Sequence, residues 1–157
     1  MIRQQIGDIL EIRFENNWFY LVILTKIILF GGNLVFAFHN YGKQMRRDEL
    51  LQLKDGFNIC TDLLLQKRAG LVQRIGKVED VDPYFKTRYI KSTDPMGKGV
   101  KAKNWYIHHL DDNYNNHIVV EKLTDEFKHA MDSGTHSFNL VANKILCRYT
   151  PDQDDRI

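Results

Sequence analysis

Residues 18–30 read WFYLVILTKIILF, and this most apolar stretch of the chain decides the fold. The stretch includes Thr25 and Lys26 and is too short for a membrane-spanning helix, which needs about 20 apolar residues. Its aromatic and β-branched side chains favour a β-strand that is apolar on both faces. We therefore expect residues 18–28 to form a strand that is central or covered on both sides, and we expect no membrane association.

Further strand signals lie on both sides of this stretch. Residues 10–14 read LEIRF, and this alternation predicts a half-buried strand whose polar face carries Glu11. The pair of asparagines at residues 16–17 predicts a tight turn, because asparagine tolerates positive φ. Residues 31–33 read GGN, a hairpin signal, and residues 34–39 form the next predicted strand. The first forty residues therefore predict an antiparallel meander.

The rest of the chain mixes helix and strand signals. An acidic turn at residues 79–83 is the expected boundary between a strand-rich half, residues 6–78, and a second half, residues 84–150. The strand-rich half ends with short predicted elements, at residues 48–53, 57–60, 63–65 and 71–78. The second half begins with a predicted strand and a predicted hairpin, at residues 84–90, 105–110 and 117–123.

Two helices are expected near the end of the chain. Thr124 can cap the first, over residues 125–132, because acidic residues in a first helical turn suit the helix dipole. The second presents one apolar face at helical spacing, formed by Phe138, Val141, Ala142, Ile145 and Leu146. Residues 152–157 are polar and are expected to fray. The chain is predicted to be a single α+β domain over residues 1–157, with antiparallel, partly barrel-like sheets and two C-terminal helices.

The composition is that of an ordinary soluble globular protein, with 43% hydrophobic and 27% charged residues. The 22 Lys and Arg against 20 Asp and Glu give a net charge of +2, which alone does not indicate nucleic-acid binding, because phosphate binding needs clustered cations. Residues 1–5 lack a signal-peptide hydrophobic region. Cys60 and Cys147 are expected to be two buried free thiols, with a disulfide as the less favoured alternative, so we expect a cytoplasmic protein.

Four short segments, in this order, resemble the immunity protein 26 family of bacterial polymorphic toxin systems. They read IGDILEI at residues 6–12, YLVIL at 20–24, LVFAF at 34–38 and GLVQRIGKV at 70–78, so the resemblance covers residues 6–78. The resemblance implies that the protein binds and neutralises a cognate toxin domain, for example in contact-dependent growth inhibition. Such proteins act by stoichiometric contact, which implies no catalytic residues and no cofactor.

The sequence offers little support for a catalytic or metal-binding site. His108 and His109 would point to opposite faces of a strand, so the two cannot readily share one metal ion. His108, Asp111 and His117 could meet across the predicted hairpin, but a polar hairpin end is the favoured alternative. We therefore predict no catalytic site, no metal site and no enzymatic activity.

The alternative function is that of a small nucleic-acid-binding barrel, which would use basic residues to bind phosphates. The scattered cations are Lys43, Arg46, Arg47, Lys67, Arg68 and Arg74. Acidic residues interleave with them and weaken the field, which makes nucleic acid an unfavoured partner. A glycine loop at residues 97–99, followed by Lys101 and Lys103, lacks the following helix that a phosphate-binding loop requires.

The loop between the two strands of the predicted hairpin is the candidate partner-binding site. It combines carboxylates, an aromatic ring and amides, and interface anchors often join an aromatic residue with charges that steer approach. The predicted partner-binding residues are Asp111, Asp112, Tyr114, Asn115 and Asn116. A merely solvated loop is the alternative. The leading hypothesis is an inhibitor that binds a toxin domain through this loop.

Overall fold

The computed structural model describes residues 4–27, 31–94, 99–112 and 115–157. The chain forms two compact units. Unit 1 comprises Met1–Phe85 and Gly134–Tyr149, and unit 2 comprises Lys86–Ser133 and Thr150–Ile157. The chain first passes from unit 1 to unit 2 after Phe85, just beyond the predicted boundary at residues 79–83. The units nevertheless differ from the predicted halves, because residues 134–149 pack with the strand-rich part of the chain.

Unit 1 is built on a six-stranded sheet in the order β10-β4-β3-β2-β1-β5. Its strands are β1 (Asp8–Phe14), β2 (Asn17–Ile27), β3 (Gly32–Tyr41), β4 (Gly56–Asp62), β5 (Val72–Lys77) and β10 (His136–Ser137). Neighbouring strands are antiparallel except β10 and β4, which pair in parallel. The central place of β2 confirms the prediction from its apolar sequence. Strands β2 and β3 pair antiparallel as the hairpin signal predicts, but Gly32 and Asn33 of the predicted turn already belong to β3, where they pair with Ile27 and Lys26.

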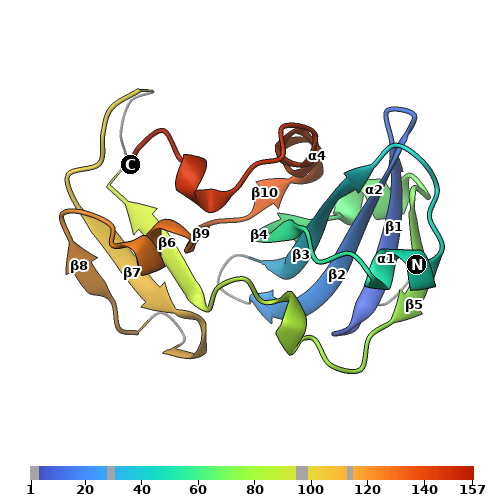
Figure 1. Ribbon diagram of the computed structural model, residues 1–157, viewed down its shortest axis with the longest axis horizontal. Helices are drawn as coiled ribbons and strands as arrows, with labels where there is room; N and C mark the ends of the chain where they lie inside the picture. The colour runs from blue at the N-terminus through green and yellow to red at the C-terminus, as the bar shows by residue number, and fades with distance from the viewer. Residues whose placement is uncertain (1–3, 28–30, 95–98, 113–114) are drawn as a thin grey trace. The chain divides into compact units, whose positions relative to one another are not determined.

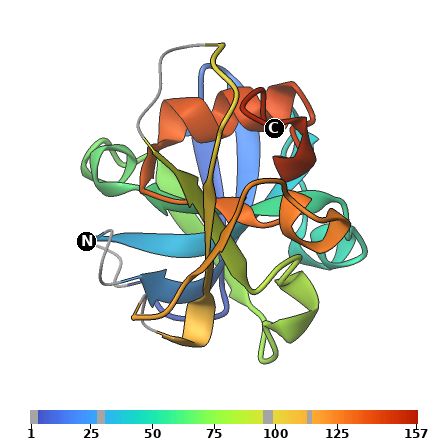
Figure 2. The same cartoon turned by 90° about the vertical axis from the view of Figure 1, so that its left-hand side faces the viewer.

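Helix α4 (Phe138–Leu146) covers one face of this sheet (Figure 1). Phe138, Val141, Ala142 and Ile145 are buried against the strands, as the helical spacing predicts, whereas Leu146 is exposed. Figure 2 shows the helix against the same strands from a second direction. The short elements of unit 1 are α1 (Arg47–Leu51), α2 (Leu64–Arg68) and the 3-10 turn η1 (Asp82–Tyr84).

The predicted polar face of β1 is wrong, because Glu11 is 1% exposed. The Tyr20 hydroxyl donates to Glu11 Oε2 at 3.1 Å, and Gln44 Nε2 donates to Oε1 at 3.2 Å. Burial, together with the neighbouring Glu11 carboxylate, raises the pKa of Tyr20 to about 12. Glu11 is therefore satisfied inside the unit, and β1 is covered on both faces along most of its length.

The α+β class is confirmed, but the six-stranded sheet does not close in the partly barrel-like way that we predicted. Among the described residues, the edge strands β10 and β5 each pair with a single neighbour. Closure requires the two edge strands to pair with each other. The two residues of β10 pair in parallel with β4 and lead directly into α4, so this edge of the sheet stays open.

Unit 2 contains a four-stranded sheet in the order β8-β7-β6-β9. Its elements are β6 (Tyr89–Thr93), β7 (Trp105–His109), η2 (Leu110–Asp112), β8 (Ile118–Val120), α3 (Asp125–Lys128), β9 (Met131–Asp132) and η3 (Pro151–Gln153). Strands β7 and β8 pair antiparallel, which confirms the predicted hairpin.

Two other predictions for this region are wrong. The strand predicted at residues 84–90 begins at Tyr89, because Tyr84 instead ends η1 and packs its ring against Phe36 in unit 1. The first of the two predicted C-terminal helices stops at Lys128, because Met131 and Asp132 pair in parallel with β6. Backbone pairing with the sheet therefore replaces the last turns of the predicted helix.

A buried lysine organises the small core of unit 2. Lys91 is fully buried beside Trp105, and its Nζ donates to the carbonyl oxygens of Lys128 at 2.9 Å and Pro151 at 2.5 Å. Nζ also lies 3.9 Å from Asp154 Oδ2. Burial lowers the pKa of Lys91, although neighbouring carboxylates act in the opposite direction. Lys91 thereby ties residues 150–157 to the sheet.

The prediction that residues 152–157 fray is therefore wrong. Arg156 donates to Asp132 Oδ1 at 3.0 Å and to Asp154 Oδ2 at 2.6 Å, and its guanidinium lies 5.6 Å from the Trp105 ring centroid. We call Lys91, Asp132, Asp154 and Arg156 the Lys91 network. These charges hold a polar C-terminal segment against the unit, which its sequence alone does not indicate.

Only one of the two cysteines lies in the predicted environment. Cys60 is buried, as predicted, whereas Cys147 is exposed, because it follows the last turn of α4 instead of lying on its buried face. Both thiols are free. In the described part of the chain, every helix is too short or too polar to span a membrane.

Candidate functional site

The predicted partner-binding loop lies at the end of the β7–β8 hairpin in unit 2. Asp111 and Asp112 belong to the 3-10 turn η2 and are exposed, as are Asn115 and Asn116. Tyr114 lies outside the described residues. The Asp111 N–H donates to His109 Nδ1 at 3.3 Å, and the Asn115 N–H donates to the Asp112 carbonyl at 3.0 Å. These hydrogen bonds give the acidic end of the hairpin a defined shape.

One face of the hairpin gathers aromatic and imidazole rings beside this loop. Tyr106 pairs with Val119 in the antiparallel register, and the Tyr106 ring lies 5.6 Å from that of His117. His117 in turn lies 5.3 Å from His108, measured between ring centroids. We call these four residues, Tyr106, His108, His117 and Val119, the outer hairpin face.

His108 and His117 thus do meet across the hairpin, which was the less favoured alternative, but Asp111 does not join them. Asp111 contacts His109, whose ring packs against Tyr89. Burial and the neighbouring His117 lower the pKa of His108, although the Asn116 backbone acts in the opposite direction. Within the described ranges, no three His, Cys, Asp or Glu side chains gather closely enough to hold a metal ion.

The outermost strand of this sheet exposes apolar side chains that sequence reasoning missed. Ile118 is 55% exposed and Val119 is 53% exposed. Among the described residues, β8 pairs only with β7, so its second backbone edge has no partner strand (Figure 1). The available signal was the run Ile118–Val120, because a three-residue edge strand cannot bury apolar side chains on both faces.

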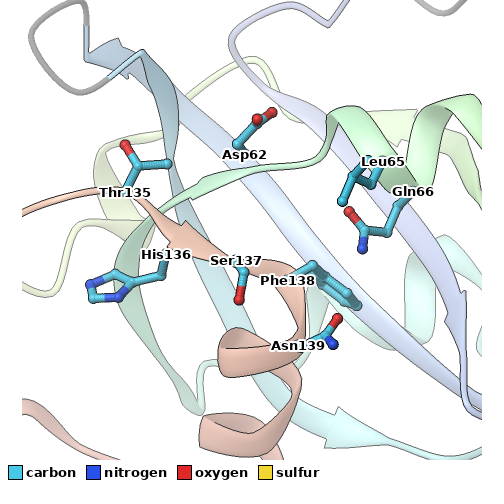
Figure 3. A pocket seen from close by; sticks show the side chains of 8 residues that line it. All are labelled: Asp62, Leu65, Gln66, Thr135, His136, Ser137, Phe138 and Asn139. Carbon is cyan, nitrogen blue, oxygen red and sulfur yellow. The ribbon is translucent and has the colours of Figure 1, made fainter.

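Unit 1 contains a second candidate site, a cavity of about 380 Å³ beside β10. It is lined by Asp62, Leu65, Gln66, Thr135, His136, Ser137, Phe138 and Asn139 (Figure 3). The lining comes from two segments about seventy residues apart, which the parallel pairing of β10 with β4 brings together. The sequence carried no signal for this pairing.

Several of the basic candidates lie beside carboxylates or carbonyl oxygens. In the predicted glycine loop, residues 97 and 98 lie outside the described residues, and Lys101 donates to the carbonyl oxygens of Asp155 and Ile157. Three of the scattered arginines lie beside carboxylates, as the pairs Arg46–Glu49 at 3.2 Å, Arg47–Asp48 at 3.6 Å and Arg74–Asp8 at 3.6 Å. These carboxylates weaken the field that would attract a phosphate backbone.

No protein-family model matches this chain, and neither does any curated protein or any solved structure. The resemblance of residues 6–78 to the immunity protein 26 family therefore stays a prediction.

Proposed function

We propose that this protein binds and neutralises a bacterial toxin domain by stoichiometric contact, and that the end of the β7–β8 hairpin is the contact surface. The toxin-inhibitor role comes from the resemblance of residues 6–78 to the immunity protein 26 family. In this proposal the protein acts in the cytoplasm and has no catalytic centre of its own.

The single observation that carries the docking surface is the exposure of Ile118 and Val119 on an edge strand. Both side chains are more than half exposed, although folding normally favours the burial of such residues. Val119 pairs with Tyr106 and so lies beside the rings of the outer hairpin face, whereas Ile118 pairs with Ile107 and points to the other face of the sheet. An apolar and aromatic centre with charged residues at its margin is the usual composition of a protein interface.

The charges at the hairpin end favour a protein partner over nucleic acid. Asp111 and Asp112 are exposed on the turn that follows β7. Two neighbouring carboxylates repel a phosphate backbone, whereas they attract a partner with a basic surface and speed its association. A weakly basic chain can therefore still present an acidic surface to a basic toxin.

Co-expression with any toxin domain that is encoded next to this protein tests the proposal. We expect the protein to restore growth and to form a 1:1 complex on a sizing column. The Val119→Lys substitution should weaken that complex by about tenfold or more, because it places a charge at the apolar centre of the surface. Restored growth that survives this substitution without any loss of affinity would place the contact elsewhere.

Val100→Lys is the matched control. Val100 is also a valine of unit 2, and its 49% exposure is close to that of Val119. It lies outside the outer hairpin face, so its substitution should leave affinity for the toxin unchanged. If the purified protein neither rescues growth nor forms a complex, the toxin-inhibitor proposal is wrong.

A further inference from the structure

The inner face of the β7–β8 hairpin ends in an exposed isoleucine that the outer hairpin face does not account for. Ile118 pairs with Ile107, which is 2% exposed in the apolar core of unit 2, so both side chains lie on the inner face of the sheet. Ile118 itself is 55% exposed. The apolar core of unit 2 therefore continues to an uncovered side chain on the outermost strand (Figure 1).

The free edge of β8 presents the backbone of one residue. The Leu110 N–H donates to the Arg88 carbonyl at 2.8 Å, so the backbone of every second residue before Leu110 faces β6. The backbone of Ile107 therefore faces β8, and that of its register partner Ile118 faces β7. Val119 consequently directs its N–H and C=O away from β7, and within the described ranges no hydrogen bond occupies these two groups.

The residues of β8 do not protect this edge against pairing. Natural edge strands discourage pairing with another chain by charged side chains and bulges. The edge strand β5 of unit 1 has both, because it exposes Arg74 and Lys77 and its register with β1 shifts. Strand β8 consists of three β-branched apolar residues, Ile118–Val120, which favour strand pairing.

The sequence around Val119 is complementary to itself. In an antiparallel pair of identical strands centred on one residue, positions at equal distances before and after the centre lie opposite each other. With Val119 at the centre, Ile118 lies opposite Val120 of a second copy, and His117 lies opposite Glu121 of a second copy. The N–H and C=O of the two Val119 residues bond each other.

Both sets of opposed side chains suit this register. Val120 packs against the core of unit 2 on the inner face, so Ile118 gains an apolar neighbour there. His117 lies on the outer face, where its ring contacts Tyr106, and both His117 and Glu121 are exposed. An imidazole N–H can donate to a carboxylate across two strands, whereas like charges at these positions would repel.

We propose that two copies of this chain associate through β8, in an antiparallel pair centred on Val119 that joins two four-stranded sheets into one of eight strands. The occupant of the free edge is thus a second copy of the protein. The pairing uses the edge of β8 and Ile118 on the inner face, so it does not cover the outer hairpin face. It is independent of toxin binding, and its test uses no toxin.

Sedimentation equilibrium of the whole protein alone tests the proposal. Short edges bury little area, so we expect a monomer–dimer equilibrium with a dissociation constant between about 10 µM and 1 mM. Protein that stays monomeric up to about 1 mM would overturn the proposal.

Val119→Pro tests the role of the edge backbone. Proline removes the N–H that points away from β7, and edge strands tolerate proline at such positions, so the hairpin should keep its pairing with β7. Dimerisation should weaken at least about tenfold, because both central hydrogen bonds lose their donor. Val119→Thr is the matched control, because threonine keeps the N–H and the β-branched shape, and it should dimerise as the unchanged protein does. A dimer that survives Val119→Pro unchanged would not be formed by this edge.

A charge exchange tests the register with two surface substitutions. Glu121→Lys removes both contacts of His117 with the opposite carboxylate, and His117→Glu places two pairs of carboxylates opposite each other, so each variant alone should dimerise weakly. In a mixture of the two variants, one contact is the original pair and the other joins the introduced glutamate to the introduced lysine. The mixed dimer should therefore form at least about fivefold more tightly than either variant alone. If mixing brings no gain, the register centred on Val119 is wrong.

Discussion

Both units bury charged side chains, but these side chains contribute to the two cores in different ways. In unit 1, Glu11 lies within a sheet that is covered by apolar side chains on both faces, and Tyr20 and Gln44 satisfy its carboxylate. In unit 2, the buried apolar cluster is formed by Trp105, Ile107 and Leu123, and the Lys91 network lies against it. The carboxylate is an addition to a large apolar core, whereas the lysine helps to assemble a small one.

This difference accounts for the exposed strand of unit 2. Ile118 and Val119 add little buried area to their own unit, because both remain more than half exposed. The unit instead holds residues 150–157 through the carbonyl oxygens and carboxylates around Lys91. Unit 1 should therefore depend mainly on apolar packing and unit 2 on buried polar contacts, and three substitution experiments test that contrast.

The largest expected effect is that of Phe19→Ala in unit 1. The Phe19 ring lies 5.8 Å from Phe138 on α4 and 6.1 Å from Tyr41, measured between ring centroids. Its removal leaves a cavity under α4 and should lower the free energy of unfolding by about 3–5 kcal/mol. Urea denaturation followed by circular dichroism measures this loss.

Tyr41→Ala is the control for that substitution. Tyr41 stacks on Phe19 but is 44% exposed, so its removal should cost about 1 kcal/mol or less. Equal losses in the two variants would mean that apolar burial under α4 is not what holds unit 1 together.

The second expected effect is that of Lys91→Met in unit 2. Methionine keeps an unbranched apolar stem but lacks the terminal ammonium group, so the carbonyl oxygens of Lys128 and Pro151 lose their shared donor. Loss of buried, charge-assisted hydrogen bonds should lower the stability of unit 2 by about 2–4 kcal/mol. In a Trp18→Phe background, Trp105 is the single tryptophan, so its fluorescence follows unit 2.

The same experiment can show whether unit 1 opens at the same time. Cys60 is buried in unit 1, and burial raises the pKa of its thiol, so it should react with thiol reagents only when unit 1 opens. We expect Lys91→Met to leave Cys60 protected. Lys101→Met is the control, because Lys101 is exposed and also donates to backbone carbonyls of the C-terminal segment. If Lys101→Met lowered the stability of unit 2 as much as Lys91→Met does, burial of the lysine would not be the cause of the loss.

Local sequence patterns predicted the elements whose burial is uniform or follows a single repeat. Strand β2 is a continuous run of aromatic and β-branched residues and helix α4 presents apolar residues at helical spacing, so both were recognised. Glu11 was misassigned because its partners are Tyr20, on the neighbouring strand, and Gln44, 33 residues away. Alternation of polar and apolar residues cannot reveal a distant hydrogen-bond partner.

The two candidate sites differ in the same way. The hairpin loop was recognised because its turn residues lie between two strand signals that are close in the sequence. The cavity was not recognised, because Asp62 and Ser137 meet only through a parallel strand pair between distant segments. Long-range parallel pairing depends on the packing of the whole unit, and no local pattern records it.

The smallest expected effect is a pH dependence in unit 2 that comes from His108. Burial and the neighbouring His117 lower the pKa of His108 below the 6.5 of an exposed histidine. As the pH falls below 6.5, the unfolded chain therefore takes up a proton before the folded chain does. The free energy of unfolding should fall from pH 6.5 down to the folded pKa of His108 and then level off. The pKa values of Asp55 and Asp152 lie below 3.8, so their titration does not overlap this window.

Urea midpoints of unit 2 between pH 8 and pH 5 measure this effect, followed by Trp105 fluorescence in the Trp18→Phe background. His108→Gln should flatten the profile, because it removes the titrating ring. His109→Gln should keep the profile, because it leaves His108 and its contact with His117 in place. A profile that stays the same in His108→Gln would assign the pH dependence to another group. It would also mean that protonation of the outer hairpin face does not measurably change the stability of unit 2.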